Sequence, residues 1–168
     1  MKTLRILMCA IIALTYTALA NAQNAPAKEN NLLITYYSVK NALISGNATS
    51  TNEKAKDFLA AATTFPTDKL SPAEKIAWAK YSEKLQFDAR HISESNDIAH
   101  QREHFAALSE NMFAFIKLVK INTAPVYRDY CPMKKTYWLS ETAAIKNPYF
   151  GNQMLTCGQV KETLQADK

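Results

Sequence analysis

The sequence SPAEKIAWAKYSEKLQFDARH, residues 71–91, holds the clearest helix signal in the chain. Ser71 is placed to cap a helix, Pro72 occupies its first position, and Glu74 completes a capping box. Apolar residues then recur at helical spacing, at Ile76, Trp78, Tyr81, Leu85 and Phe87. The stretch therefore predicts an amphipathic helix that ends near His91.

Three further segments have the same helical period. They run from about Leu32 to Ser45, from about Ser50 to Thr64 with a capping box of Ser50 and Glu53, and from about Ser95 to Lys120. Only three of the 168 residues are glycine, which counts against an all-β fold with its many tight turns. Long amphipathic helices with short links predict a mostly α domain over residues 32–168, arranged as an antiparallel up-down four-helix bundle.

The first 22 residues have the pattern of a secretory signal peptide. Lys2 and Arg5 precede a nearly continuous apolar run of about 15 residues, and Ala20-Asn21-Ala22 offers a cleavage site before Gln23. The run is shorter than the roughly 20 residues that span a bilayer. We therefore expect an exported, periplasmic protein without stable membrane insertion, and we expect residues 23–31 to form a disordered lead.

The charge balance and the missing motifs exclude several classes of function. Residues 1–22 hold two of the 20 basic residues and none of the 15 acidic ones, so the rest of the chain has a net charge of only +3. A nucleic-acid groove normally needs a clustered basic face. The chain has no P-loop, no dinucleotide-binding glycine fingerprint and no G-x-S-x-G motif. We predict neither nucleic-acid binding nor an enzyme.

Residues 125–158 differ from the helical part because they are rich in cysteine, methionine and aromatic side chains and contain Pro132 and Pro148. Proline interrupts regular structure. We expect a short strand or extended segment, then irregular loops, and a brief terminal helix from about Gln159. So many aromatic residues also predict that this segment packs on the helices.

Two short motifs in this segment carry sulfur ligands. Cys131 lies two residues before Met133, and Met154 lies three residues before Cys157. Thiolates and thioethers together suit Cu(I), so these four residues are candidate copper ligands. The alternative is a disulfide between the two cysteines, which persists in an oxidising compartment and would close a loop of about 27 residues.

The three histidines fall within 14 residues of one another. His100 and His104 are four residues apart, so they are neighbours on one helix face and are candidate additional ligands. His104 lies at the edge of the apolar stripe, whereas His100 lies farther from it. His91 precedes the break between two helices and receives no role. The segment His100-x-x-Glu103-His104 also matches a zinc-peptidase pattern, but the domain offers little room for a substrate cleft.

Several motifs together resemble a known family. They are Gln101-Arg102 with Phe105, Leu108 and Ser109, then Cys131-Pro132-Met133, Trp138-Leu139, Asn147-Pro148-Tyr149-Phe150-Gly151, and Met154-Leu155-Thr156-Cys157-Gly158. They resemble the bacterial domain-of-unknown-function family 3347. Its members are secreted proteins of one domain, or C-terminal domains of periplasmic adaptor subunits in copper/silver-type efflux systems. The resemblance implies a heavy-metal-handling module and supplies no reaction.

The sequence thus predicts a non-enzymatic periplasmic protein that binds copper, as Cu(I), for resistance or for delivery to an efflux adaptor. The rival hypothesis is an envelope interaction domain that is stapled by a Cys131–Cys157 disulfide and has no metal role.

Overall fold

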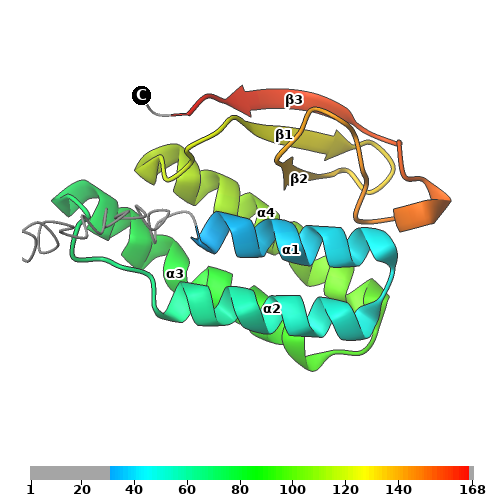
Figure 1. The fold of residues 1–168 in the computed structure, drawn as a ribbon, viewed down its shortest axis with the longest axis horizontal. Helices are drawn as coiled ribbons and strands as arrows, with labels where there is room; N and C mark the ends of the chain where they lie inside the picture. Colours follow the sequence, from blue (N-terminus) through cyan, green and yellow to red (C-terminus); the bar gives the residue numbers. More distant parts are fainter. Residues whose placement is uncertain (1–30, 167–168) are drawn as a thin grey trace, which may run out of the picture.

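The computed structural model describes residues 31–166 (Figure 1). The expected signal peptide and residues 23–30 of the expected lead lie outside this range, and Asn31 is the first residue of the first helix. Among the helices of residues 31–166, none is both long enough and apolar enough to cross a membrane.

The described part of the chain is mostly α-helical. Its helices are α1 (Asn31–Ser45), α2 (Ala48–Thr63), α3 (Pro72–Glu94) and α4 (Ile98–Val119), and each packs against the next one in sequence. The predicted capping box of α3 is confirmed, because Ser71 Oγ accepts from the Glu74 amide and the Glu74 carboxylate accepts from the Ser71 amide.

The predicted start of α2 is wrong by two residues. Its cap is Asn47, whose side chain accepts a hydrogen bond from the Ser50 amide at 2.9 Å. Ser50 is therefore inside the first turn and supplies a donor to the cap. Asparagine is as good a cap as serine, and a cap at Asn47 in place of Ser50 lets the helix begin earlier.

The apolar stripe of α3 is narrower than its sequence suggests. Tyr81 and Leu85 are buried, but Ile76 is 71% exposed and Phe87 is 55% exposed. The buried face of α3 follows Ala77, Tyr81, Leu85, Asp88, Ala89 and Ile92. This spacing leaves Ile76 and Phe87 on the outer side of the helix, away from the core.

The link between α3 and α4 is only three residues long, Ser95 to Asp97. Asp97 caps α4 by accepting from the Ala99 amide at 2.8 Å. The fully buried Gln101 donates to the Ser95 carbonyl oxygen at 2.6 Å and to the Ala48 carbonyl oxygen at 3.0 Å. The contact with Ser95 ties α4 to the end of α3 in a tight helical hairpin, and the contact with Ala48 ties α4 to the start of α2.

The C-terminal segment forms a small antiparallel sheet in the order β2-β1-β3. Its strands are β1 (Val126–Cys131), β2 (Thr136–Ser140) and β3 (Gln159–Leu164), with a 3₁₀ turn, η2, at Gly151–Gln153. The expected terminal helix from Gln159 is therefore wrong. Residues 159–164 instead pair with β1, with Tyr130 opposite Gln159. So short a segment is a poor isolated helix, whereas the open edge of β1 offers hydrogen-bond partners along its length.

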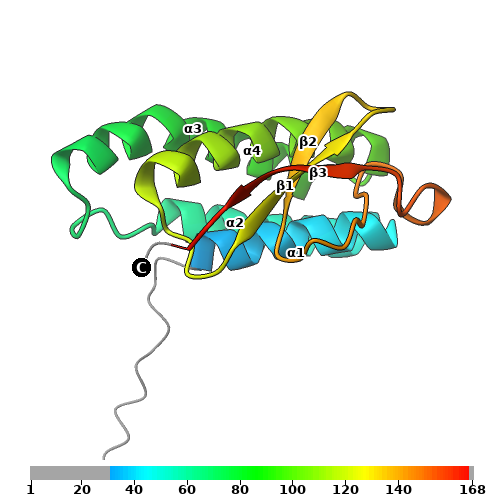
Figure 2. The same cartoon turned by 90° about the horizontal axis from the view of Figure 1, so that it is seen from above.

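The sheet lies beside α1 and α4 (Figures 1 and 2) and shares their core. Trp138 and Leu139 of β2 are buried among the helical core residues. The fully buried Tyr36 hydroxyl lies 2.7 Å from Ser109 Oγ and accepts from the Leu139 amide at 2.9 Å. One hydroxyl thus joins α1, α4 and β2, and the C-terminal segment packs on the helices as the sequence predicts.

Candidate metal centre

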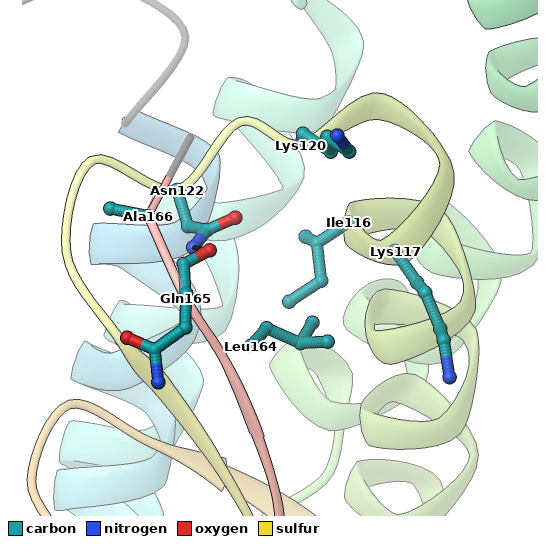
Figure 3. Close-up of a pocket in the computed structure, with 7 residues that line it drawn as sticks. All are labelled: Ile116, Lys117, Lys120, Asn122, Leu164, Gln165 and Ala166. Atoms are coloured by element: carbon teal, nitrogen blue, oxygen red, sulfur yellow. Dashed lines mark hydrogen bonds between the residues drawn. The ribbon is translucent and has the colours of Figure 1, made fainter. Parts of the chain in front are cut away.

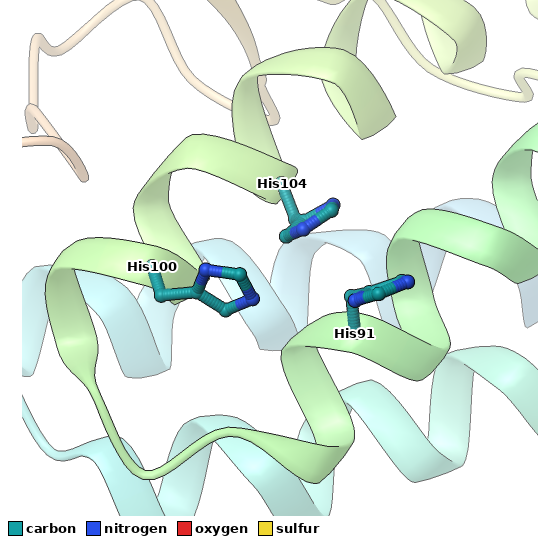
Figure 4. A group of neighbouring side chains, drawn as sticks. All are labelled: His91, His100 and His104. Atoms are coloured by element: carbon teal, nitrogen blue, oxygen red, sulfur yellow. The ribbon is translucent and has the colours of Figure 1, made fainter.

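All three histidines of the chain come together on the α3–α4 hairpin (Figure 4). His91 belongs to α3, and His100 and His104 belong to α4. One ring nitrogen from each lies within 4.8 Å of the other two, and all three side chains are half-buried. Three imidazoles on two rigid helices form the richest set of metal donors among the described residues.

The short link explains why these residues meet. His91 lies four residues before Ser95, and His100 lies three residues after Asp97, so the two face each other across the turn. His104 follows one helical turn after His100 on the same face. The tight hairpin therefore brings a third imidazole to a pair that is adjacent by sequence alone.

The rings are close but are not yet arranged around one point. The rings of His91 and His104 are stacked, with centroids 4.4 Å apart and planes 12° apart, and His100 meets His104 edge-on at 4.7 Å. A metal lies in the plane of each ring that binds it, at about 2.0–2.1 Å from nitrogen, which places neighbouring nitrogens about 3.3 Å apart. Side-chain rotation, chiefly of His91 and His100, would have to bring the three nitrogens to this spacing.

Asp88 supports the cluster from α3. Its Oδ1 lies 3.0 Å from Nδ1 of His104, and the residue is only 5% exposed. Burial raises the pKa of Asp88 above its ordinary value, while the hydrogen bond with His104 opposes that shift. In its ionised form this carboxylate only accepts hydrogen bonds, so it holds a proton on Nδ1 and leaves Nε2 of His104 free to bind a metal.

Phe87 lies against the cluster on the α3 side. The Phe87 ring lies 4.3 Å from the His91 ring and 5.9 Å from the His104 ring, measured between centroids. The groove between α3 and α4 continues past Phe87 and Asp88 into a cavity of about 350 Å³, lined also by Glu83, Lys84 and Asn111. The cavity therefore lies next to the cluster and shares Phe87 and Asp88 with its surroundings, while none of the three histidines lines it.

The structure places the predicted sulfur ligands elsewhere, in the C-terminal segment. Cys131, at the end of β1, is fully buried, and its Sγ accepts from Asn147 Nδ2 at 3.2 Å. The same amide donates to the Cys157 carbonyl oxygen at 2.7 Å, so Asn147 joins the two cysteine-bearing turns. Both cysteines are free thiols in the structure, and Met133 is 62% exposed. His100 and His104, expected as additions to this sulfur set, lie instead with His91.

A second cavity, of about 340 Å³, lies between the end of α4 and the end of β3 (Figure 3). Its lining is Ile116, Lys117, Lys120, Asn122, Leu164, Gln165 and Ala166. The Asn122 amide already donates to the carbonyl oxygens of Gln165 and Ala124. This cavity contains no histidine, cysteine or carboxylate, so its chemistry is much poorer than that of the histidine cluster.

The donor set defines what the cluster can hold. Neutral imidazole suits zinc, copper, nickel and iron, and three protein ligands leave at least one coordination position for water or another ligand. Sequence reasoning selected His100 and His104 and missed His91. Its position on the other side of a short interhelical turn is the signal that could have identified it.

Fold and site together describe a small, mostly α-helical protein with a three-strand sheet and a cluster of three histidines on a helical hairpin. Residues 32–124 match the family described as "Protein of unknown function (DUF3347)", and the chain belongs to this family. The matched residues include all three histidines and end before Cys131, Met133, Met154 and Cys157. No curated protein and no solved structure matches the chain significantly.

Proposed function

We propose that this protein binds a transition-metal ion at His91, His100 and His104. The observation that carries the proposal is the convergence of one ligand nitrogen from each of the three histidines within 4.8 Å. Neutral imidazole is the commonest metal ligand in proteins, and this cluster offers three of them at one place.

The scaffold behind the cluster supports this role. Phe105 and Leu108, which follow His104 on α4, are fully buried, and so is Ile92, which follows His91 on α3. The backbone of each ligand is therefore fixed by the core while its side chain reaches the groove. The antiparallel up-down order expected of the four helices is part of the same proposal, because it places α3 and α4 side by side along their length.

Copper is the ion that we propose as cargo, and the periplasm is the compartment. The support is the signal-peptide pattern of residues 1–22 and the kind of protein in which the family domain occurs. A periplasmic efflux adaptor is the proposed partner, and the protein carries the ion without catalysing a reaction. Imidazole binds copper well, so this cargo fits the cluster.

An alternative metal position, at the sulfur residues, is supported by one observation. Asn147 holds Cys131 Sγ and the Cys157 carbonyl oxygen through a single nitrogen, so the two cysteine-bearing turns are neighbours. Cys131, Met133, Met154 and Cys157 form the soft set that suits Cu(I). The competing outcome for the same neighbours is oxidation to a disulfide.

The two sites can be separated in one experiment on the purified protein. Wild type, a triple His91→Ala, His100→Ala, His104→Ala variant and a double Cys131→Ser, Cys157→Ser variant are titrated with Cu²⁺ against a competing chelator. We expect about one ion per chain in wild type, no binding in the histidine variant and unchanged binding in the cysteine variant.

Loss of binding in the cysteine variant, with unchanged binding in the histidine variant, would assign the ion to the sulfur residues. Absence of binding in wild type, under both oxidising and reducing conditions, would refute the proposed function. A thiol count on protein isolated from the periplasm decides between the free thiols and the disulfide. Circular dichroism of every variant confirms that the helices remain intact.

A further inference from the structure

Asp88 is a nearly buried acidic residue that contacts the histidine cluster. Its carboxylate meets Nδ1 of His104 at 3.0 Å. It lies on α3 one turn before His91, so a single helix contributes both a ligand and the group behind another ligand. Buried charged groups are costly unless they are paired, and Asp88 has side-chain hydrogen bonds with both His104 and Asn111.

The hydrogen bond determines which nitrogen of His104 can bind a metal. A carboxylate has no proton to donate, so the proton between Asp88 and His104 belongs to Nδ1. The lone pair is then on Nε2, on the opposite side of the ring. The same bond restricts rotation of the ring, which lowers the entropy lost when the ion binds.

Charge adds a second effect. Three neutral imidazoles leave the full charge of a bound ion uncompensated, and the penalty grows with that charge in a half-buried site. The carboxylate of Asp88 lies directly behind a ligand, where it stabilises a divalent ion more than a monovalent one. Imidazole is also the ligand type of divalent zinc, copper and nickel, whereas the softer sulfur set suits Cu(I).

We propose that Asp88 is the positioning residue of this site, that it makes His104 bind through Nε2, and that it suits the cluster to a divalent ion. This inference rests on the proposed function, since it concerns how the same three histidines hold their metal. It deepens that function by naming the divalent state of the ion and a fourth residue on which binding depends.

The first test needs no substitution. The chain has only three histidines, so a ¹⁵N-histidine-labelled sample gives three imidazole spin systems, which single histidine variants assign. In the metal-free protein we expect His104 to carry its proton on Nδ1, and we expect addition of Zn²⁺ to shift its Nε2 resonance. A proton on Nε2 in the metal-free protein would overturn the inference.

The second test compares Asp88→Asn with Glu103→Gln, using Zn²⁺ alone in competition with a chelator. Both variants lose one negative charge, but Glu103 is exposed and neighbours His104 only in sequence. Loss of a carboxylate behind a ligand typically weakens metal binding by about 10–100-fold. We expect that loss in Asp88→Asn and less than about a threefold change in Glu103→Gln.

The outcomes distinguish the inference from the proposed function. If wild type binds no Zn²⁺ and no Cu²⁺, the proposed function fails. If wild type and both variants bind Zn²⁺ equally well, the histidine site stands and the role of Asp88 is refuted. If Asp88→Asn loses helical signal, the His104 tautomer in wild type decides the matter, because that measurement does not depend on the variant.

Discussion

Replacement of Asp129 by Asn should make the protein more stable at alkaline pH and leave its stability unchanged at acid pH. Asp129 lies in the middle of β1 and is fully buried, and neither of its carboxylate oxygens has a hydrogen-bond partner. Burial raises the pKa of Asp129 from 3.8 to about 7, although the charge of Lys40 acts in the opposite direction. The folded protein therefore holds a proton at this site over a pH range in which the unfolded chain has lost it.

The sign and size of the effect follow from this difference. A carboxyl group whose pKa rises on folding favours the folded state most at low pH, and the advantage is lost as the pH rises from 3.8 to about 7. Each pKa unit corresponds to about 1.4 kcal/mol, so the ionised group costs the folded state about 4 kcal/mol above neutral pH. Asparagine has nearly the same shape and no charge, and it avoids this cost.

The assay is urea unfolding, followed by circular dichroism, at several values from about pH 4 to about pH 8. We expect equal free energies of unfolding for wild type and Asp129→Asn at the acid end, and a gain of about 4 kcal/mol for the variant at the alkaline end. Asp68→Asn is the matched control, because Asp68 is exposed. If the difference in the free energy of unfolding between Asp129→Asn and wild type does not change with pH, ionisation of Asp129 does not destabilise the folded protein.

Two further predictions concern the core that holds the site. Leu108→Ala removes a fully buried side chain of α4, and we expect it to lower the free energy of unfolding by about 2–5 kcal/mol. A loss below about 1 kcal/mol would show that α4 does not depend on this contact. Tyr36→Phe leaves the buried Leu139 amide without its acceptor, so we expect the free energy of unfolding to fall by about 1–3 kcal/mol. Urea unfolding measures this loss with Tyr37→Phe as the control, and equal stability of the two variants would contradict this role of the hydroxyl.

Local sequence was sufficient to predict the helices and the pairing of His100 with His104. The Ser71 capping box and the i, i+4 spacing of His100 and His104 act within one or two helical turns, so they can be read without knowing the fold. The start of α2 was missed because Asn47 and Ser50 both satisfy the local rules for a cap, and the helix gains length by using the earlier one.

The C-terminal segment shows where local rules stop. Residues 159–164 become β3 because β1 lies beside them with an open edge, and nothing in their own sequence reveals that partner. The same is true of Asn147, which reaches both Cys131 and the carbonyl oxygen of Cys157 only after the intervening loops have folded. Pairing between segments distant in sequence depends on the whole chain.

The mostly helical fold and the shared face of His100 and His104 both follow from the period of the α-helix, so the amino-acid sequence is enough to predict them. Only the tertiary structure decided that His91 and Asp88 join them. The turn at residues 95–97 folds α3 back along α4. It brings the imidazole of His91 to the two histidines of α4 and places the carboxylate of Asp88 behind His104. A metal site needs ligands that converge in space, and convergence between two helices is set by how they pack.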